Sequence, residues 1–123
     1  INTDPLYPIM VEEKMYQSYD ISQWGERYFV INEQGHVEVR PFQQQGGDLF
    51  ELMKSLVAQG IEPPILVRFN GIIQDRIAKL SQAFQTAIQE FKYLSTHQMV
   101  FPIKVNPHRH VVETVQQAGH AYR

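Results

Sequence analysis

Short apolar runs alternate with helical patterns along the second half of the chain. Residues 65–69 and 99–105 are apolar and strand-like, and each run precedes a segment with helical spacing, over about 70–92 and 109–117. Strand, helix, strand and helix in this order are typical of parallel α/β folds, in which a helix carries the chain back to begin the next strand. Pro102 cannot donate to a sheet ladder, so we expect a bulge or an unpaired side there.

The helix expected over residues 70–92 carries one apolar stripe. Asn70 is a typical N-cap residue and is expected to begin it. Apolar residues then recur every three or four positions, at Ile73, Ile77, Leu80, Phe84, Ile88 and Phe91. Because residues with this spacing share one face of a helix, the stripe predicts packing against a core.

The first half of the chain predicts a β-hairpin. Two β-rich runs within residues 27–40 flank the letters NEQG, and Gly35 suits a turn position with positive φ. Val37 and Val39 alternate with polar residues, which predicts one buried and one solvated face.

A further helix is expected to follow the hairpin. Asp48 is a typical N-cap, apolar residues recur at helical spacing to about Ala58, and Gly60 lies where a C-terminal cap is expected. Before the hairpin, a leader over residues 1–19 has a possible short helix at about 12–17.

Composition excludes several classes of function. The 123 residues fit one small domain, carry a formal net charge of −2 and include no cysteine. The near balance of charge argues against a nucleic-acid or polybasic membrane partner, and the lack of cysteine excludes disulfides and thiolate chemistry. No apolar run is long enough to span a bilayer and no signal peptide is recognised, so we expect a cytoplasmic location. Because the first residue is Ile1, we expect the chain to begin inside a longer product, or a leader to have been removed.

Lys104 is the residue that most suggests chemistry. It lies near the C-terminal end of an apolar run and just before a helix, and ligands bind at that end of the strands in α/β folds. To react as a free amine near neutral pH, a lysine needs its pKa lowered by roughly three units, or about 4 kcal/mol, which burial in an apolar pocket supplies. From the spacing alone, a Schiff-base lysine and a solvent-exposed lysine both stay open, and the second is commoner.

Several motifs resemble one family of enzymes. The letters FPIKVN, which contain Lys104, and RHVV a little further on resemble the cofactor-lysine segment of the biosynthetic arginine decarboxylases. The likeness includes earlier motifs in the same order: YDISQWG, YFVINEQGHVEVRP, GIEPPILVRF and IQDRI. The chain departs from the family at Asn70-Gly71, where a proline is frequent, and at Pro107 and His108, where a glutamine usually follows the asparagine.

The resemblance implies a pyridoxal-phosphate enzyme that converts L-arginine to agmatine and carbon dioxide in polyamine and spermidine biosynthesis. It implies that Lys104 forms the Schiff base with the cofactor. It also implies a requirement for magnesium, for which no ligand can be assigned, and a homo-oligomeric full-length enzyme.

The fold class that the resemblance implies is α/β. Residues 1–47 would be an N-terminal segment with the hairpin, and residues 48–123 would be the first βα units of a TIM-type (β/α)8 barrel like that of alanine racemase. A closed barrel needs eight strands, so the barrel would be incomplete in this chain. We therefore expect an N-terminal portion of the enzyme that does not decarboxylate arginine alone.

Two other functions stay open. The same cofactor chemistry can act on ornithine, lysine or diaminopimelate. Residues that choose the substrate are expected mostly outside this chain, so only the segment from Trp24 to Pro41 favours arginine here. Alternatively, the chain is a non-catalytic regulatory or binding fragment.

Other polar residues have weaker signals. Asn106 is a candidate for orienting the lysine or the cofactor, although an asparagine after a strand is more often a turn or cap residue. His108 and His110 form a His-x-His pair without a nearby carboxylate, so solvated or phosphate-facing roles are favoured over metal binding. Arg68 is a candidate for meeting an anion, and a surface ion pair is about equally expected. Trp24 is expected in the core of the N-terminal segment, together with Tyr28 and Phe29.

Overall fold

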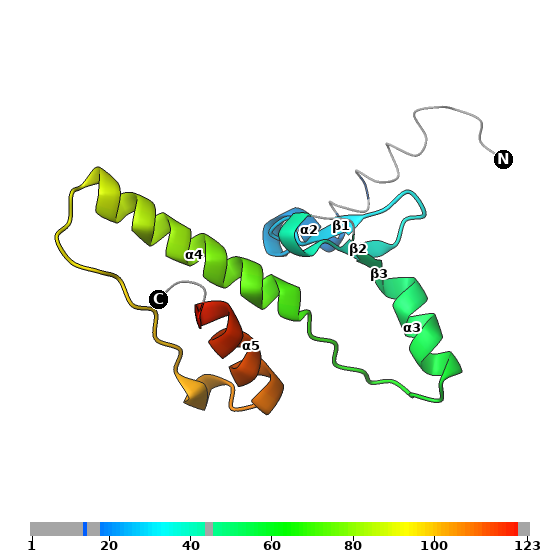
Figure 1. Cartoon of the computed structure of the whole chain (residues 1–123). Helices are drawn as coiled ribbons and strands as arrows, with labels where there is room; N and C mark the ends of the chain where they lie inside the picture. The colour runs from blue at the N-terminus through cyan, green and yellow to red at the C-terminus, as the bar shows by residue number, and fades with distance from the viewer. Residues whose placement is uncertain (1–13, 15–17, 44–45, 121–123) are drawn as a thin grey trace. The chain divides into compact units, whose positions relative to one another are not determined.

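The computed structural model of the chain describes residues 14, 18–43 and 46–120 (Figure 1). The chain divides into two compact units, Ile1–Val67 and Arg68–Arg123. The helix expected at about 12–17 falls almost entirely outside the described residues. The domain division expected between residues 47 and 48 stays a prediction.

A hairpin forms the centre of the first unit, as the sequence predicted. Strand β1 (Phe29–Ile31) pairs antiparallel with β2 (Val37–Val39), and Gly35 has a φ of 80° in the turn between them. A two-residue strand, β3 (Gly47–Asp48), pairs with the other edge of β2 and gives the sheet order β1-β2-β3. A short helix α2 (Ile21–Trp24) precedes the sheet, and a 3-10 turn η1 (Pro41–Gln43) follows β2.

Helix α3 (Leu49–Ala58) completes the first unit. Asp48 caps it by accepting hydrogen bonds from the backbone N–H groups of Phe50 and Glu51, and Gly60 beyond its end has a φ of 84°, so both predicted helix ends are confirmed. The helix contacts β2 and β3, but none of its residues is fully buried. The core of this unit is instead made by Ile21, Tyr28, Ile31 and Val39.

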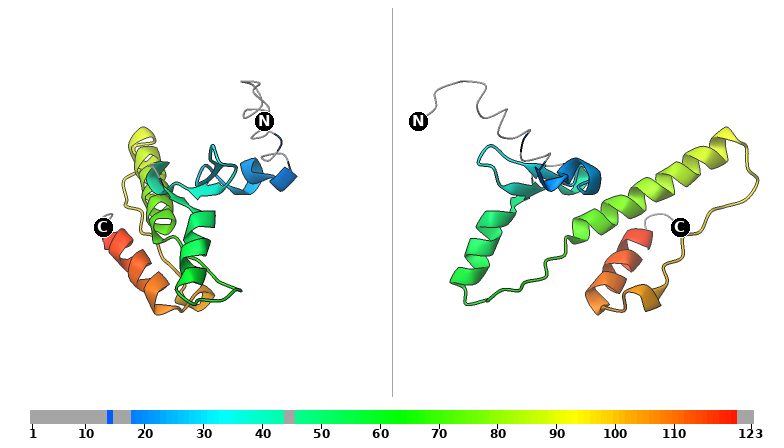
Figure 2. Two further views of the ribbon diagram at one scale, coloured as in Figure 1. Left: turned by 90° about the vertical axis from the view of Figure 1, so that its right-hand side faces the viewer. Right: turned by 180° about the vertical axis from the view of Figure 1, so that it is seen from behind.

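Two helices that run side by side form most of the second unit. Helix α4 (Asn70–Glu90) contacts α5 (Arg109–His120), and both run in the same general direction while the segment between them returns along their length (Figures 1 and 2). Ile77 of α4 and Val111 of α5 are buried, and Thr114 is buried with its hydroxyl donating to the carbonyl of His110 at 2.7 Å. The predicted helices are confirmed, with α5 three residues longer than expected.

The predicted stripe of α4 is only partly covered. Ile77 is buried and Ile73 and Ile88 are half-buried, but Leu80, Phe84 and Phe91 are exposed. The predicted capping role of Asn70 is wrong. Asn70 is the first helical residue, and no side chain caps this end of the helix.

The two strands expected in the second half are absent. Residues 65–69 have no regular structure, and residues 99–105 are irregular up to a 3-10 turn, η2 (Ile103–Val105). A two-stranded parallel pair exposes both faces and is not stable by itself, because parallel sheets need cover on both sides. Local sequence therefore favours strands here, whereas the described part of the chain provides no sheet to hold them.

No helix in the described residues combines the length and the apolar character needed to cross a membrane.

Candidate functional site

Lys104 lies in the middle of turn η2 and is exposed to solvent. The turn is closed by a 3.0 Å hydrogen bond from Val105 N to the carbonyl oxygen of Pro102. The apolar neighbours are exposed too, with exposed fractions of 81% for Val100, 55% for Ile103 and 76% for Val105. The expectation that an apolar strand shields Lys104 is therefore wrong for this structure, because no sheet excludes water from the segment. Its role as the cofactor lysine stays a prediction.

Of the requirements of a pyridoxal-phosphate site, the surroundings of Lys104 meet only accessibility of the amine, because no apolar cover shields it from water. A lysine amine attacks an aldehyde only when it has lost its proton and is free of a partner. Among the residues that the structure describes, none forms an ion pair or hydrogen bond with the Lys104 side chain. The amine is accessible for that reaction, but nothing around it lowers its exposure to water.

Asn106 is occupied by the local backbone. Its Oδ1 accepts a 3.3 Å hydrogen bond from the backbone N–H of His108, the residue just before α5 begins. Such a bond is typical of an asparagine that organises a turn before a helix. The contact favours the structural role, and orientation of a cofactor by Asn106 stays a prediction.

The two histidines at the start of α5 lie close together on the surface. The ring centroids of His108 and His110 are 5.7 Å apart, with 28° between the ring planes. Between them, Arg109 Nε donates to Glu113 Oε1 at 2.7 Å, one turn along the helix. The described residues contain no group of three or more His, Cys, Asp or Glu side chains that could hold a metal ion, so magnesium stays unassigned.

Arg68 and Trp24 are both exposed. The indole Nε1 of Trp24 donates to the carbonyl of Tyr19 at 2.9 Å, and its ring lies 5.2 Å from that of Phe29. The expected burial of Trp24 is wrong, whereas that of Tyr28 is confirmed. Trp24 remains outside because α2 buries Ile21 instead.

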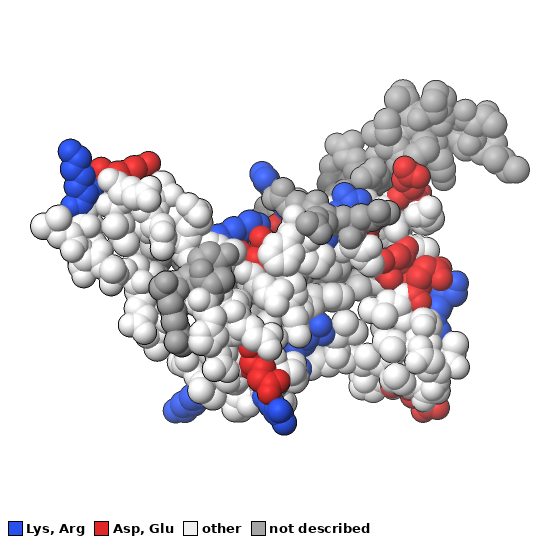
Figure 3. Space-filling model, in the orientation of Figure 1, with Lys and Arg blue, Asp and Glu red and all other residues white. Residues whose placement is uncertain are grey.

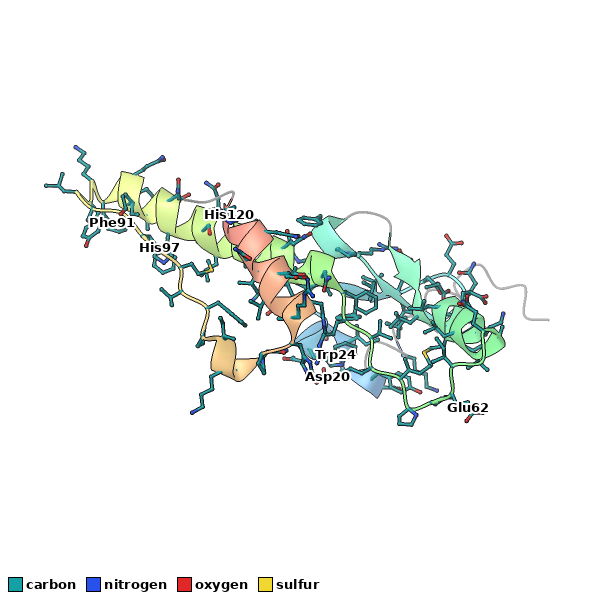
Figure 4. The ribbon with its side chains drawn as sticks, turned by 60° about the horizontal axis from the view of Figure 1, so that its bottom comes forward. Asp20, Trp24, Glu62, Phe91, His97 and His120 are labelled. Atoms are coloured by element: carbon teal, nitrogen blue, oxygen red, sulfur yellow. The ribbon has the colours of Figure 1, made fainter. Side chains whose placement is uncertain are left out.

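A groove in the second unit was not expected from the sequence. Its volume is about 770 Å³, and it lies between α4, α5 and residues 95–101. His97, on the segment labelled in Figure 4, stacks on Phe84 of α4 with centroids 3.8 Å apart and 5° between planes. Met99 and Phe101 also line the groove, but Lys104 does not. The sequence does not indicate this packing, because the residues around His97 are polar and show no apolar periodicity.

A polar cluster in the first unit was also missed. Asp48 Oδ2 accepts hydrogen bonds from Asn32 Nδ2 at 2.7 Å and from His36 Nδ1 at 2.8 Å, while its Oδ1 caps α3. Desolvation by itself raises the pKa of the Asp48 carboxyl. Hydrogen bonds from the Glu51 backbone N–H, His36 and Asn32 lower the pKa by more than desolvation raises it, so that it lies at about 2. No residue of this cluster is near Lys104 in sequence, and the cluster is structural in character.

On the face drawn in Figure 3, the charged side chains of the described residues form no large area of one sign. In Figure 3, Lys and Arg atoms lie beside Asp and Glu atoms at several places on the visible face. Several are explicit pairs, such as Lys54 with Glu51 at 3.0 Å and Arg40 with Glu38 at 2.8 Å. This distribution agrees with the formal net charge of −2.

Comparison with curated proteins places the sequence among known enzymes. The chain is 44% identical over 103 residues to the biosynthetic arginine decarboxylase of Prochlorococcus marinus (strain MIT 9303), which covers 82% of the chain and 16% of that protein. It is 46% identical over 106 residues to biosynthetic arginine decarboxylase 1 of Synechocystis sp. (strain ATCC 27184 / PCC 6803 / Kazusa), covering 85% of the chain and 15% of that protein.

The chain is related to the biosynthetic arginine decarboxylases. It is also 42% identical over 113 residues to the enzyme of Gloeobacter violaceus, covering 90% of the chain and 18% of that relative. The chain thus spans less than a fifth of the length of these relatives, which agrees with the predicted N-terminal portion. No protein-family model matches it. No solved structure matches it either.

Proposed function

We propose that the chain is a portion of a pyridoxal-phosphate-dependent arginine decarboxylase and that Lys104 is the residue to which the cofactor is attached. The observation that carries this proposal is 40–46% identity to biosynthetic arginine decarboxylases over more than four fifths of the chain. Among the described residues, Lys104 is the lysine in the motif that resembles the family's cofactor segment.

The arrangement of the second unit supports a barrel built from βα units. Helices α4 and α5 run in the same direction, as successive helices do when each one is followed by a strand that returns the chain. Half-buried and exposed residues alternate strictly over 65–69 and over 97–102, which is the side-chain period of a strand. We propose that both segments become barrel strands in the intact enzyme.

Lys104 would hold the cofactor aldehyde through Nζ. When bound, pyridoxal phosphate supplies an electron sink that lets the substrate lose carbon dioxide. The role of this chain in the proposed reaction is to provide one accessible amine, that of Lys104, at the end of a strand-like segment. Residues for the phosphate, the ring nitrogen and the substrate carboxylate belong to other parts of the proposed enzyme.

The proposed substrate is L-arginine, and the products are agmatine and carbon dioxide for polyamine biosynthesis. The relatives are arginine decarboxylases, which favours arginine over ornithine, lysine or diaminopimelate. The proposal also includes a cytoplasmic location, a homo-oligomeric full-length enzyme and a requirement for magnesium. No feature of the described residues specifically favours a non-catalytic fragment.

Cofactor attachment in the intact protein tests the proposal. Pyridoxal phosphate should give a visible absorbance band, and borohydride reduction should then fix the cofactor to the peptide that contains Lys104, as seen by mass spectrometry. Lys104→Ala should abolish both signals, whereas Lys92→Ala, which removes another exposed lysine of the same unit, should change neither. Reduction at a different lysine, or a band that survives in Lys104→Ala, would show that the assignment is wrong.

A further inference from the structure

Residues 97–102 run along one side of the second unit (Figures 1 and 2). Their odd-numbered positions are half-buried and their even-numbered positions are exposed. Met99 and Phe101 line the groove against α4 and α5. A strand has this pattern when helices cover only one of its faces. The segment is therefore strand-like and packed on one face, although it pairs with no other strand among the described residues.

The backbone of this segment is open to pairing. Within the described parts of the chain, residues 94–101 make no hydrogen bond to another backbone group. A row of unpaired N–H and C=O groups on an extended segment is a template for a second strand. An antiparallel pair can keep one face in water while the other face is packed, so a strand added here needs no further cover.

The segment is complementary in charge to a second copy of itself. Pairing of identical strands brings identical side chains together, and like charges directly opposite each other are destabilising. Residues 93–103 contain no Lys, Arg, Asp or Glu, whereas the other apolar run, residues 65–69, contains Arg68. Charged side chains on an edge strand commonly prevent such pairing. The edge of residues 97–102 lacks that protection, and its Val100 side chain is 81% exposed.

We propose that residues 98–102 pair antiparallel with the same residues of a second copy of the chain, about a two-fold axis at Val100. In this register the exposed Val100 side chains of the two copies contact each other and are removed from water. The neighbouring register, in which Val100 faces Gln98 of the other copy, leaves the apolar side chain against a polar one. Burial of Val100 therefore favours the register centred on it.

Pro102 also agrees with this register. Proline has no N–H, and the Pro102 carbonyl oxygen already accepts a 3.0 Å hydrogen bond from Val105 N. Pro102 therefore fits a non-hydrogen-bonded position of an antiparallel pair, where both backbone groups point away from the partner strand. Because the two kinds of position alternate, Val100 is also non-hydrogen-bonded, and Met99 exchanges two backbone hydrogen bonds with Phe101 of the other copy.

The inference goes beyond the proposed function and does not use Lys104. In the proposed barrel, a neighbouring strand of the longer enzyme takes the same edge, so that pairing and the pairing between copies exclude each other. In the 123-residue chain, the described residues leave this edge open, and the second copy occupies it.

Sedimentation of the purified 123-residue chain tests the association. The interface is small, so we expect the dimer to appear only as the concentration rises toward about 1 mM. Val100→Asp brings two carboxylates together at the axis and should weaken the association at least about tenfold. Leu66→Asp changes an apolar residue of similar exposure, 76% against 81%, and should leave the association unchanged. Helical circular dichroism confirms that both variants are folded.

Cross-linking tests the register. The chain has no cysteine, so a single introduced cysteine can form a disulfide only with another copy. Val100→Cys should dimerise under mild oxidation at least about tenfold faster than Leu66→Cys, because opposite Cβ atoms at a non-hydrogen-bonded position lie within reach of a disulfide. Gln98→Cys, on the same face, should react slowly because Gln98 faces Pro102 of the other copy.

The outcomes decide between the second copy and other occupants of the edge. A chain that stays monomeric up to about 1 mM, or a Val100→Asp variant that associates as the unchanged chain does, would overturn the proposal and leave the edge to a strand of the longer enzyme. Equal cross-linking of Gln98→Cys and Val100→Cys would overturn the register. Lys104→Ala should leave the association unchanged, so failure of the proposed cofactor attachment is distinguishable from failure of this inference.

Discussion

The imidazole Nδ1 of His36 lies 2.8 Å from Oδ2 of Asp48, so the end of the hairpin turn is bonded to the residue that begins helix α3. The rings of His36 and Phe50 are also in contact, with centroids 4.5 Å apart. The same carboxylate also contacts helix α3, because its other oxygen accepts hydrogen bonds from the backbone amides of Phe50 and Glu51. This polar contact therefore joins the hairpin to helix α3, beside the small apolar core of the first unit.

The Asp48 carboxylate should make the stability of the first unit depend on acid. Its pKa in the folded chain is about 2, below the ordinary value of 3.8. A carboxyl group whose pKa is lower in the folded chain than in the unfolded chain stabilises the folded state at pH values above its unfolded-state pKa. This stabilisation is lost as the pH falls through its folded-state pKa. We expect the free energy of unfolding to decline between about pH 4 and pH 2, and urea titrations at a series of pH values measure it.

The matched variant for this prediction is Asp48→Asn, which keeps an oxygen that can cap α3 but has no charge. The variant should be less stable than the unchanged chain near neutral pH, and the difference should disappear near pH 2. A difference that stays constant across the range would contradict a role for the charge.

Two adjacent glycines should respond very differently to alanine. A Cβ on Gly46 would overlap the carbonyl oxygen of Val39, whereas one on Gly47 would meet nothing within 4 Å. Gly46→Ala should therefore destabilise the first unit by about 3 kcal/mol or more, because the backbone must move. Gly47→Ala should change stability by no more than about 0.5 kcal/mol. Urea unfolding followed by the fluorescence of the single tryptophan, Trp24, compares them.

The contact between α4 and α5 depends on a buried valine. Val111 is only 4% exposed, so Val111→Ala should cost about 2 kcal/mol through lost burial and the resulting cavity. Gln117→Ala changes an exposed residue of the same helix and should have almost no effect. Thermal unfolding followed by helical circular dichroism measures both, and equal losses would argue against this packing.

The stacked pair of Phe84 and His97 should hold the segment after α4 against that helix. Aromatic pairs contribute about 0.5–1.5 kcal/mol beyond area burial, so His97→Leu should cost about 1 kcal/mol. It should also speed hydrogen exchange in residues 95–99. His120→Leu, at the exposed end of α5, is the control and should leave exchange in that segment unchanged.

The chain alone should not release carbon dioxide from arginine. The purified 123-residue chain, supplied with pyridoxal phosphate and magnesium, should show no turnover above a Lys104→Ala control. Lys104 is exposed in this structure, and the expected partners of the cofactor lie elsewhere. Robust turnover by the chain would contradict the view that it supplies only part of a site.

Local chemistry explains which elements could be predicted from the sequence. The hairpin turn depends on Gly35, the start of α3 on the Asp48 carboxylate, and the helices on apolar residues three and four positions apart. Each of these signals acts within a few residues. Strand β3 was missed because it has two residues and forms only by pairing with β2.

The features that the sequence did not predict depend on contacts with residues far away in the sequence. The runs 65–69 and 99–105 have strand-like sequences, but a strand also needs neighbours, which the described residues do not provide. Lys104 is unusual in its sequence context, yet its exposure depends on residues that cover the segment. The motif predicts a role for Lys104 that stays a prediction, and only the structure shows that the residue lies in a turn.

The bond between His36 and Asp48 has a consequence for how the first unit assembles. Its partners are only 12 residues apart, and those of the Asn32 bond to the same carboxylate are 16 apart. Contacts with such low sequence separation close small loops, so little chain entropy is lost before they form. We therefore expect this unit to reach its native contacts early, whereas the segment 99–105 has no ladder partner among the described residues.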